Sequence, residues 1–199
     1  TFGKFNFMAS GNVSYAKSRI LYFDEPESTL DWQKRTGQAL GADWLLYDEI
    51  GIFRSQEDLD AYPHLSNAKV GDLIFRDTNE DGVIDGNDMI RPNKTTTPEI
   101  VYGVNLGVSY GNWDLSMLWQ GATNVWQYVF FESGSIGNFT QDYFDNRWTS
   151  DNINADYPRI YDRQVTSSAQ KNTFWLNDAI YLRLKNIQLA YSMPEKIMN

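Results

Sequence analysis

The sequence has no cysteine, a single histidine and no long apolar run. The absence of cysteine among 199 residues excludes disulfide bonds and thiol catalysis. The lone histidine, His64, follows Tyr62-Pro63 in a polar stretch without a nucleophile or metal ligand at a telling spacing, which is typical of a surface residue. No segment of about 20 apolar residues is present, so no transmembrane helix is expected, and the N-terminus shows no signal-peptide pattern.

Positive charge is also scarce. The chain carries 17 Lys and Arg residues against 26 Asp and Glu, a formal net charge of -9. This charge opposes binding to phosphate backbones, and no basic patch overrides it, so nucleic acid is not an expected partner. The composition, 42% hydrophobic and 15% aromatic, suffices for an ordered structure. Because the chain begins within a predicted strand, we expect it to be a segment of a longer protein with its targeting sequence upstream.

Alternation of apolar and polar residues with period two predicts strands in four places. These strands are expected at about 4–16, 101–110, 113–121 and 179–192. The Gly111-Asn112 pair between the second and third predicts a tight hairpin turn. In the last run the apolar parity changes, which predicts a bulge near Lys185-Asn186.

The lengths of the connections sort by side. The turn at 111–112 is short, whereas the segments 17–100 and 122–178 are long, and this alternation is typical of transmembrane β-barrels. Strands of about 9 to 11 residues can cross a bilayer when tilted. Aromatic residues near strand ends would form interfacial rows: Tyr15, Tyr102, Tyr110, Trp113, Trp119 and Tyr191. The same pattern also suits the core of a water-soluble β-sandwich, which is the alternative.

Residues 77–88 have the spacing of an EF-hand-type calcium loop. Side-chain oxygens recur at loop positions 1, 3, 5, 9 and 12, the carbonyl of position 7 adds a sixth ligand, and a glycine stands at position 6: Asp77, Asn79, Asp81, Asp85, Asp88, Val83 and Gly82. Asp88 replaces the usual Glu. The flanking residues predict a short strand and a proline-broken loop rather than helices, so we interpret the ion as structural. The alternative is a solvated acidic turn.

The second long segment is rich in aromatic residues among polar ones. Exposed rings can stack on sugars while amides and carboxylates bind hydroxyls, and the candidate ligand-binding residues are Trp126, Tyr128 and Trp148. The favoured alternative is that these rings pack the segment on itself or on a partner. Carboxylate pairs such as Glu25 with Glu27, or Asp142 with Asp145, could serve a glycosidase, but acidic loops supply such pairs by chance. Residues 55–63 predict a short helix capped by Ser55 and Asp58.

The order of several motifs resembles the SusC/RagA family of TonB-dependent outer-membrane transporters. The motifs are Thr-Gly-Gln-Ala-Leu-Gly at 36–41, Gly-Ile-Phe-Arg-Ser-Gln-Glu-Asp-Leu-Asp at 51–60, the run 71–85 through the calcium-type loop, Tyr-Gly-Val-Asn-Leu at 102–106, Trp-Asp-Leu-Ser at 113–116, Gln-Gly at 120–121 and Tyr-Leu-Arg-Leu-Lys-Asn-Ile at 181–187. The resemblance implies a plugged barrel of about 22 strands that imports oligosaccharides or peptides with energy relayed by TonB. It also implies a SusD-like lipoprotein partner at the outer mouth.

We therefore expect an all-β chain, a segment from the C-terminal part of a large antiparallel transmembrane β-barrel in the bacterial outer membrane, with long extracellular loops and structural calcium. The plug and the TonB-contacting part would lie upstream. We expect no enzymatic activity. The competing hypotheses are a secreted, calcium-stabilised carbohydrate-binding β-sandwich and a glycoside hydrolase fragment.

Overall fold

The computed structural model describes residues 4–130, 139–160 and 167–193. The chain divides into two compact units, which are described separately. The sheet unit comprises Thr1–Ser18, Thr95–Trp126 and Asp178–Asn199, and the second unit comprises Arg19–Lys94 and Gln127–Asn177. Among the described residues no helix has the length and apolar character needed to cross a membrane.

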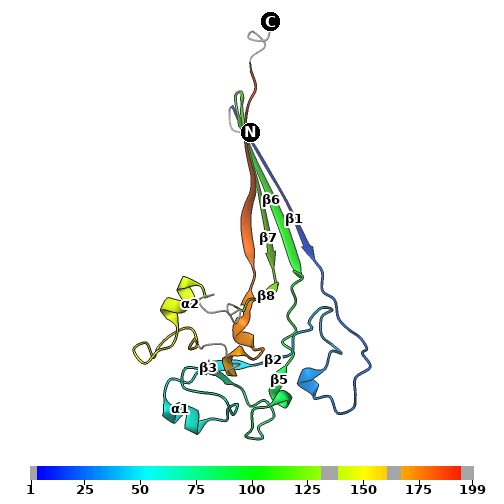
Figure 1. The fold of residues 1–199 in the computed structure, drawn as a ribbon. Coiled ribbons are helices and arrows are strands. Elements are labelled where there is room, and N and C mark those ends of the chain that lie inside the picture. The colour runs from blue at the N-terminus through cyan, green and yellow to red at the C-terminus, as the bar shows by residue number, and fades with distance from the viewer. Residues whose placement is uncertain (1–3, 131–138, 161–166, 194–199) are drawn as a thin grey trace. The chain divides into compact units, whose positions relative to one another are not determined.

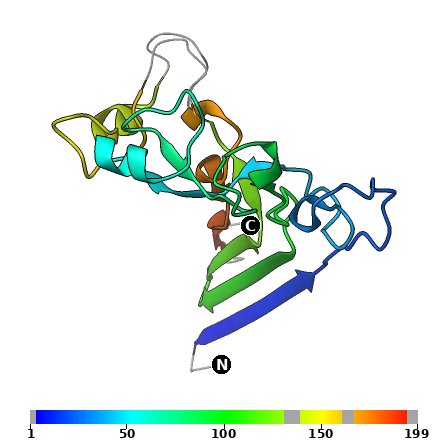
Figure 2. The same ribbon diagram turned by 90° about the horizontal axis from the view of Figure 1, so that it is seen from below.

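The sheet unit is built from four long antiparallel strands that lie side by side (Figures 1 and 2). They are β1 (Phe5–Tyr15), β6 (Ile100–Tyr110), β7 (Trp113–Thr123) and β10 (Tyr181–Tyr191), in the order β1-β6-β7-β10. All four predicted strands are thus present. The turn between β6 and β7 is the predicted one, with Gly111 at φ 59°.

The strand register gathers the apolar side chains on one face. The central row runs Ala9, Leu106, Met117 and Ile187, each paired with the next across the sheet. The predicted bulge is confirmed, because the register shifts between Leu184 and Asn186, and this shift keeps the apolar residues of β10 on the common face. The opposite face carries polar and small residues, such as Asn105 and Ser116.

Aromatic rings end this apolar face. Phe5 stacks on Tyr110 with ring centroids 4.4 Å apart, and Trp113 lies 4.7 Å from Tyr191. All four residues occupy the paired strand ends at the 110–113 turn. Amphipathic rings in this position are typical of a membrane interface.

The apolar face is not the inside of a β-sandwich. A sandwich buries such a face against a second sheet, yet Phe7, Val13 and Leu189 are 63%, 74% and 65% exposed. In the described residues β1 pairs only with β6 and β10 only with β7, so each outer strand has an open edge. An exposed apolar face with two open edges is what a segment cut from a larger membrane barrel shows.

The second unit is built from short elements. These are η1 (Asp31–Gln33), β2 (Leu46–Tyr47), β3 (Glu49–Ile52), α1 (Gln56–Ala61), β4 (Leu73–Phe75), η2 (Gly86–Asp88), β5 (Met89–Ile90), α2 (Gln141–Asn146), η3 (Ser167–Ala169) and η4 (Thr173–Trp175). β2 pairs with β5 and β3 with β4, both antiparallel. The strands β8 (Trp126–Tyr128) and β9 (Leu176–Asp178) pair where the chain passes between the units. The predicted capping box of Ser55 and Asp58 starts α1.

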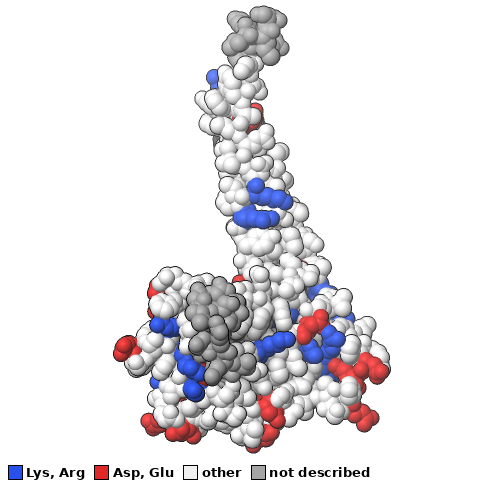
Figure 3. Space-filling view, in the orientation of Figure 1, with Lys and Arg blue, Asp and Glu red and all other residues white. Residues whose placement is uncertain are grey.

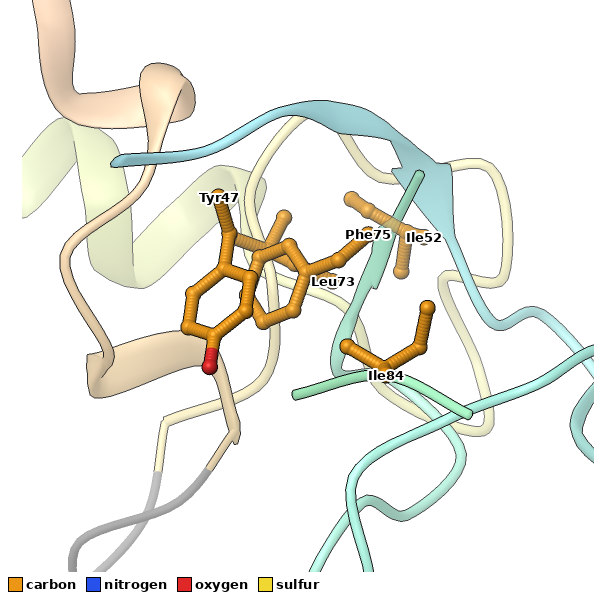
Figure 4. Close-up of a cluster of buried hydrophobic side chains, with 5 residues drawn as sticks. All are labelled: Tyr47, Ile52, Leu73, Phe75 and Ile84. Carbon is orange, nitrogen blue, oxygen red and sulfur yellow. The ribbon is translucent and has the colours of Figure 1, made fainter. Parts of the chain in front are cut away.

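The core of the second unit is a cluster of buried side chains from β2, β3, β4 and the 77–88 loop: Tyr47, Ile52, Leu73, Phe75 and Ile84 (Figure 4). Tyr47 and Phe75 stack with ring centroids 4.9 Å apart. Acidic side chains are abundant on the surface of this unit (Figure 3). The unit is therefore held by a small apolar centre under a charged exterior.

A buried ion pair ties distant parts of the second unit together. Asp72 is fully buried, and its Oδ1 and Oδ2 lie 2.8 Å from Arg159 Nε and 3.2 Å from Arg159 Nη2. The Ser168 hydroxyl also donates to Asp72 Oδ1, at 3.3 Å, and the backbone N–H of Lys69 donates to Oδ2 at 2.9 Å. The two-point geometry fixes β4 against chain segments about 90 residues away.

Candidate calcium loop and ligand pocket

The 77–88 loop lies between β4 and β5, includes η2, and is anchored by an apolar residue in its middle part. Ile84, at loop position 8, is 4% exposed and belongs to the core cluster, whereas Val83 beside it is 58% exposed. Gly82 has φ 83°, a left-handed conformation that other residues rarely adopt, which agrees with the sharp turn expected at position 6. The loop therefore lies at the surface and is fixed to the core at Ile84.

The carboxylates at the two ends of the loop accept backbone hydrogen bonds. Asp77 Oδ1 and Oδ2 accept from the N–H groups of Asp81 (3.2 Å) and Gly82 (2.8 Å). Asp88 is fully buried, and its Oδ1 and Oδ2 accept from Thr78 N–H and Asp85 N–H, both at 2.8 Å. A buried carboxylate such as that of Asp88 needs hydrogen-bond donors. The bond from the Thr78 N–H to Asp88 also joins the two ends of the loop.

The middle positions interact with one another. Asn79 Nδ2 donates to Asp81 Oδ2 at 2.7 Å, and Asn79 Oδ1 accepts from the N–H of Asp81 at 3.1 Å. Asp85 Oδ1 accepts from Asn87 N–H at 2.7 Å, capping η2. Within the described residues, no group of three or more His, Cys, Asp or Glu side chains is arranged to hold a metal ion. The side-chain oxygens of the loop are suitable calcium ligands. In this arrangement they accept hydrogen bonds from N–H groups of the loop itself.

Two residues outside the loop hold its C-terminal half. Gln33 Nε2 donates to the carbonyls of Gly86 and Met89, at 2.8 and 2.9 Å. Trp32 Nε1 donates to the carbonyl of Asn87 at 2.8 Å. Both residues lie in η1, more than 50 positions earlier in the chain, and the sequence contains no local signal for this contact. The loop is thus braced from outside as well as from within.

The acidic loop acts electrostatically on the core. Burial raises the pKa of Tyr47, and the negative charges of Asp85 and Asp88 raise it further. The loop therefore places negative charge near the edge of the core cluster, a field that a bound cation would relieve.

The three candidate ligand-binding aromatics have different surroundings. Trp148 packs against the core cluster and also on Gly71, where an added Cβ would lie 2.4 Å from the indole Cε3. Tyr128 is half-buried in β8, and burial raises its pKa, an effect opposed by a backbone hydrogen bond from Asn172. Trp126, also in β8, is half-buried and its backbone N–H donates to the Thr95 carbonyl at 2.8 Å. These settings agree with packing roles, and none of the three lines the pocket described next.

A cavity of about 390 Å³ lies within the second unit. Its walls come from α2, the 156–157 segment, η4 and β9: Asp142, Asn146, Asp156, Tyr157, Phe174, Trp175 and Asn177. Perpendicular ring contacts link Tyr157 to Phe174 (6.0 Å) and Phe174 to Trp175 (4.8 Å). Tyr143, 3% exposed, packs on both Tyr157 and Trp175. Rings of the second segment therefore do pack on one another, and they also wall a pocket.

The pocket is acidic. The Tyr157 hydroxyl donates to Asp142 Oδ2 at 2.9 Å, and Asn146 Nδ2 donates to Asp142 Oδ1 at 2.9 Å. The hydrogen bond to Asp142 raises the pKa of Tyr157, and burial together with the charges of Asp142 and Asp156 raises it further. None of the seven lining residues is basic. In the sequence Asp142 is only one of several acidic residues, and it is the fold that places it in the pocket wall.

Other residues considered from sequence do not assemble a catalytic site. His64 is exposed, and its Nδ1 lies 2.9 Å from the Tyr62 carbonyl. Glu25 accepts a short hydrogen bond from the Arg35 backbone, and Asp145 accepts from Gln141 at 2.8 Å. Each of these side chains has a local structural partner.

The antiparallel sheet with its exposed apolar face and open edges is that of a segment of a large transmembrane β-barrel. No protein-family model matches the chain. Two curated proteins of Formosa agariphila are similar to it: TonB-dependent receptor P26, 30% identical over 151 residues, and TonB-dependent receptor P3, 28% identical over 170 residues. These alignments cover 73% and 82% of the chain but only 15% and 16% of the relatives.

Solved structures show a similar fold. The chain matches the RagAB peptide transporter with TM-score 0.66 and 20% identity, over 99% of the chain and 22% of that protein. It matches the closed-closed state of the RagAB peptide importer with TM-score 0.65 and 22% identity. These comparisons confirm the resemblance to TonB-dependent transporters of the RagA type, and this class of protein resides in the outer membrane.

Proposed function

We propose that the protein containing this chain imports nutrients across the outer membrane, with energy relayed by TonB and with a SusD-like lipoprotein at its outer mouth. The chain would supply four adjoining barrel strands, and the segments 17–100 and 122–178 would lie on the extracellular side. The observation that carries the proposal is the exposed apolar face of the four-stranded sheet, ended by aromatic pairs. The relatives' names, TonB-dependent receptors and a peptide importer, support the transport role.

Membrane fractionation tests this proposal. With an antibody against residues 16–100, we expect a band in the outer-membrane fraction, much larger than this chain, whose gel mobility changes on boiling because a closed barrel resists unfolding by detergent. Uptake of labelled peptides or oligosaccharides should then stop when the host's TonB is deleted, and the labelled class that depends on TonB identifies the substrate. A soluble band at the size expected for 199 residues, with the same mobility before and after boiling, would instead support the secreted binding module.

We also propose that one calcium ion fixes the 77–88 loop. The ligands would be the side chains of Asp77, Asn79, Asp81, Asp85 and Asp88 with the carbonyl of Val83. The fixed path of the loop, the positive φ of Gly82 and the anchoring by Ile84 support a preformed loop. The ion would neutralise a group of carboxylates and so restrict the loop at the protein surface.

Limited proteolysis with and without a chelator measures the effect of this ion. We expect a chelator to increase cleavage within residues 70–95 several-fold, and added calcium to reverse it. The double substitution Asp77→Asn and Asp81→Asn keeps hydrogen-bond acceptors but removes ligand charge, so it should be cleaved readily whether calcium is present or not. Glu80→Gln, at a non-ligand position, is the matched control. Unchanged wild-type cleavage under chelation would refute a calcium site.

A further inference from the structure

The pocket of the second unit offers hydrogen-bond acceptors rather than donors. Its side-chain donors are directed to acceptors within the unit: the Tyr157 hydroxyl and Asn146 Nδ2 to Asp142, and Asn177 Nδ2 to the Trp175 carbonyl at 3.1 Å. Trp175 Nε1 donates to the Ser168 carbonyl at 3.3 Å. Asp142 and Asp156 line the pocket, and their carboxylates are acceptors only.

A pocket of acceptors excludes some ligands and favours others. Neutral sugars offer hydroxyl groups that both donate and accept, and they gain most where a protein supplies both kinds of partner. Guanidinium and ammonium groups only donate, with five and three N–H bonds respectively. Among the described residues Asp156 has no hydrogen-bond or ion-pair partner in the unit, so its charge is available to such a ligand.

The aromatic walls favour the same ligands. The aromatic residues Tyr157, Phe174 and Trp175 form part of the pocket wall, and a cation gains electrostatic attraction over an aromatic face. The described wall carries two carboxylates and no basic side chain, which favours a cationic ligand over an anionic one. The volume of about 390 Å³ accommodates a side chain or a single sugar ring.

We propose that this pocket binds a guanidinium or primary ammonium group of the imported substrate, with Asp156 and Asp142 as its charge partners and the three rings as its walls. The inference deepens the proposed import function and rests on it for its biological meaning. The same chemistry could come from an arginine or lysine side chain of a peptide or from an amino sugar. Binding at this pocket would give the second unit a role in selecting the substrate.

Calorimetric titration of the purified full-length protein tests this assignment with matched probes. One pair is a blocked Ala-Arg-Ala tripeptide and its citrulline analogue, which replaces the cation by a neutral group of similar shape. The second pair is a glucosamine trimer and its N-acetylated form. In one of the two pairs we expect the cationic probe to bind at least tenfold more tightly than its neutral partner, and that pair identifies whether the cation comes from a peptide or from an amino sugar. This preference should be lost as the salt concentration rises.

Variants locate the binding. Asp156→Asn should weaken the cationic probe about tenfold or more and leave the neutral probe unchanged. Asp151→Asn changes an exposed acidic residue of the same segment that does not line the cavity, so it should have no effect. Equal binding of cationic and neutral probes, or full affinity in Asp156→Asn, overturns the proposal. Outer-membrane location and TonB-dependent uptake would still stand in that case, so the two proposals fail independently.

Discussion

Replacing Arg159 by methionine is expected to lower the stability of the second unit by about 3 to 5 kcal/mol. The substitution keeps much of the side-chain volume but removes the cation from a carboxylate, Asp72, that is fully buried. The Ser168 hydroxyl and the Lys69 N–H remain as partners, yet neither carries charge. An uncompensated buried charge costs far more than the pair contributes over an apolar replacement.

Hydrogen exchange of the intact protein measures this effect locally. Amides of 71–76 should exchange roughly 100-fold faster or more in Arg159→Met, because 1.4 kcal/mol corresponds to a factor of ten. Arg76→Met is the control, since Arg76 pairs with Asp48 at 2.7 Å but is 56% exposed. Exposed pairs contribute about 0 to 1 kcal/mol, so its exchange should change little. Similar exchange in the two variants would contradict the structural role assigned to Asp72 and Arg159.

A double variant separates charge from packing. Adding Asp72→Asn to Arg159→Met removes the buried negative charge, and Asn keeps an oxygen for the Ser168 hydroxyl. Part of the lost protection should therefore return. If the double variant is less protected than Arg159→Met alone, the lost packing of the arginine accounts for the effect instead.

The strands could be predicted from sequence because their information is local. Alternation over 9 to 14 residues, the Gly111-Asn112 turn and the parity change at Lys185 each depend on neighbouring residues. The structure places β1, β6, β7 and β10 within two residues of the predicted bounds, and the register shift lies at the predicted bulge. The capping box at Ser55 is local in the same sense.

The calcium-type loop illustrates what spacing alone omits. Its ligand positions follow from a 12-residue pattern, but the bracing by Trp32 and Gln33 depends on contacts over more than 50 residues. The spacing does not distinguish Ile84, which is buried in the core cluster, from its apolar neighbour Val83, which is 58% exposed. The sequence pattern predicts the ligand positions of the loop, whereas the contacts that support the loop depend on the tertiary fold.

The aromatic residues of segment 122–178 show a second limit of prediction from sequence. Composition alone predicts that rings gather there, but it does not distinguish Trp148, which packs on the core, from Trp175, which walls the pocket. Asp142 meets Tyr157 only through the path of the chain between α2 and η4. Such pairings have no periodic signal, so they were not predicted.

Arginine in place of Met117 is expected to destabilise the barrel by about 2 to 4 kcal/mol. Met117 lies in the central row of the apolar face, paired with Leu106 and Ile187, and the middle of a membrane-spanning strand is expected near the bilayer midplane. A guanidinium there must be dehydrated in hydrocarbon or deform the lipid around it. The adjacent residue Ser116 points to the opposite face and is the natural control.

Ser116→Arg should cost little, because it lies opposite Gly107 and borders a depression of about 220 Å³ that also touches Asp114. Urea unfolding of the full-length protein in detergent or lipid vesicles, followed by the heat-modified gel mobility, compares the two variants directly. The expected result is a lower midpoint for Met117→Arg alone. If Ser116→Arg were the more destabilising, the polar face would be the one in contact with lipid. The assignment of the two faces of this sheet would then be reversed, and the aromatic pairs Phe5 with Tyr110 and Trp113 with Tyr191 would have to lie inside the barrel.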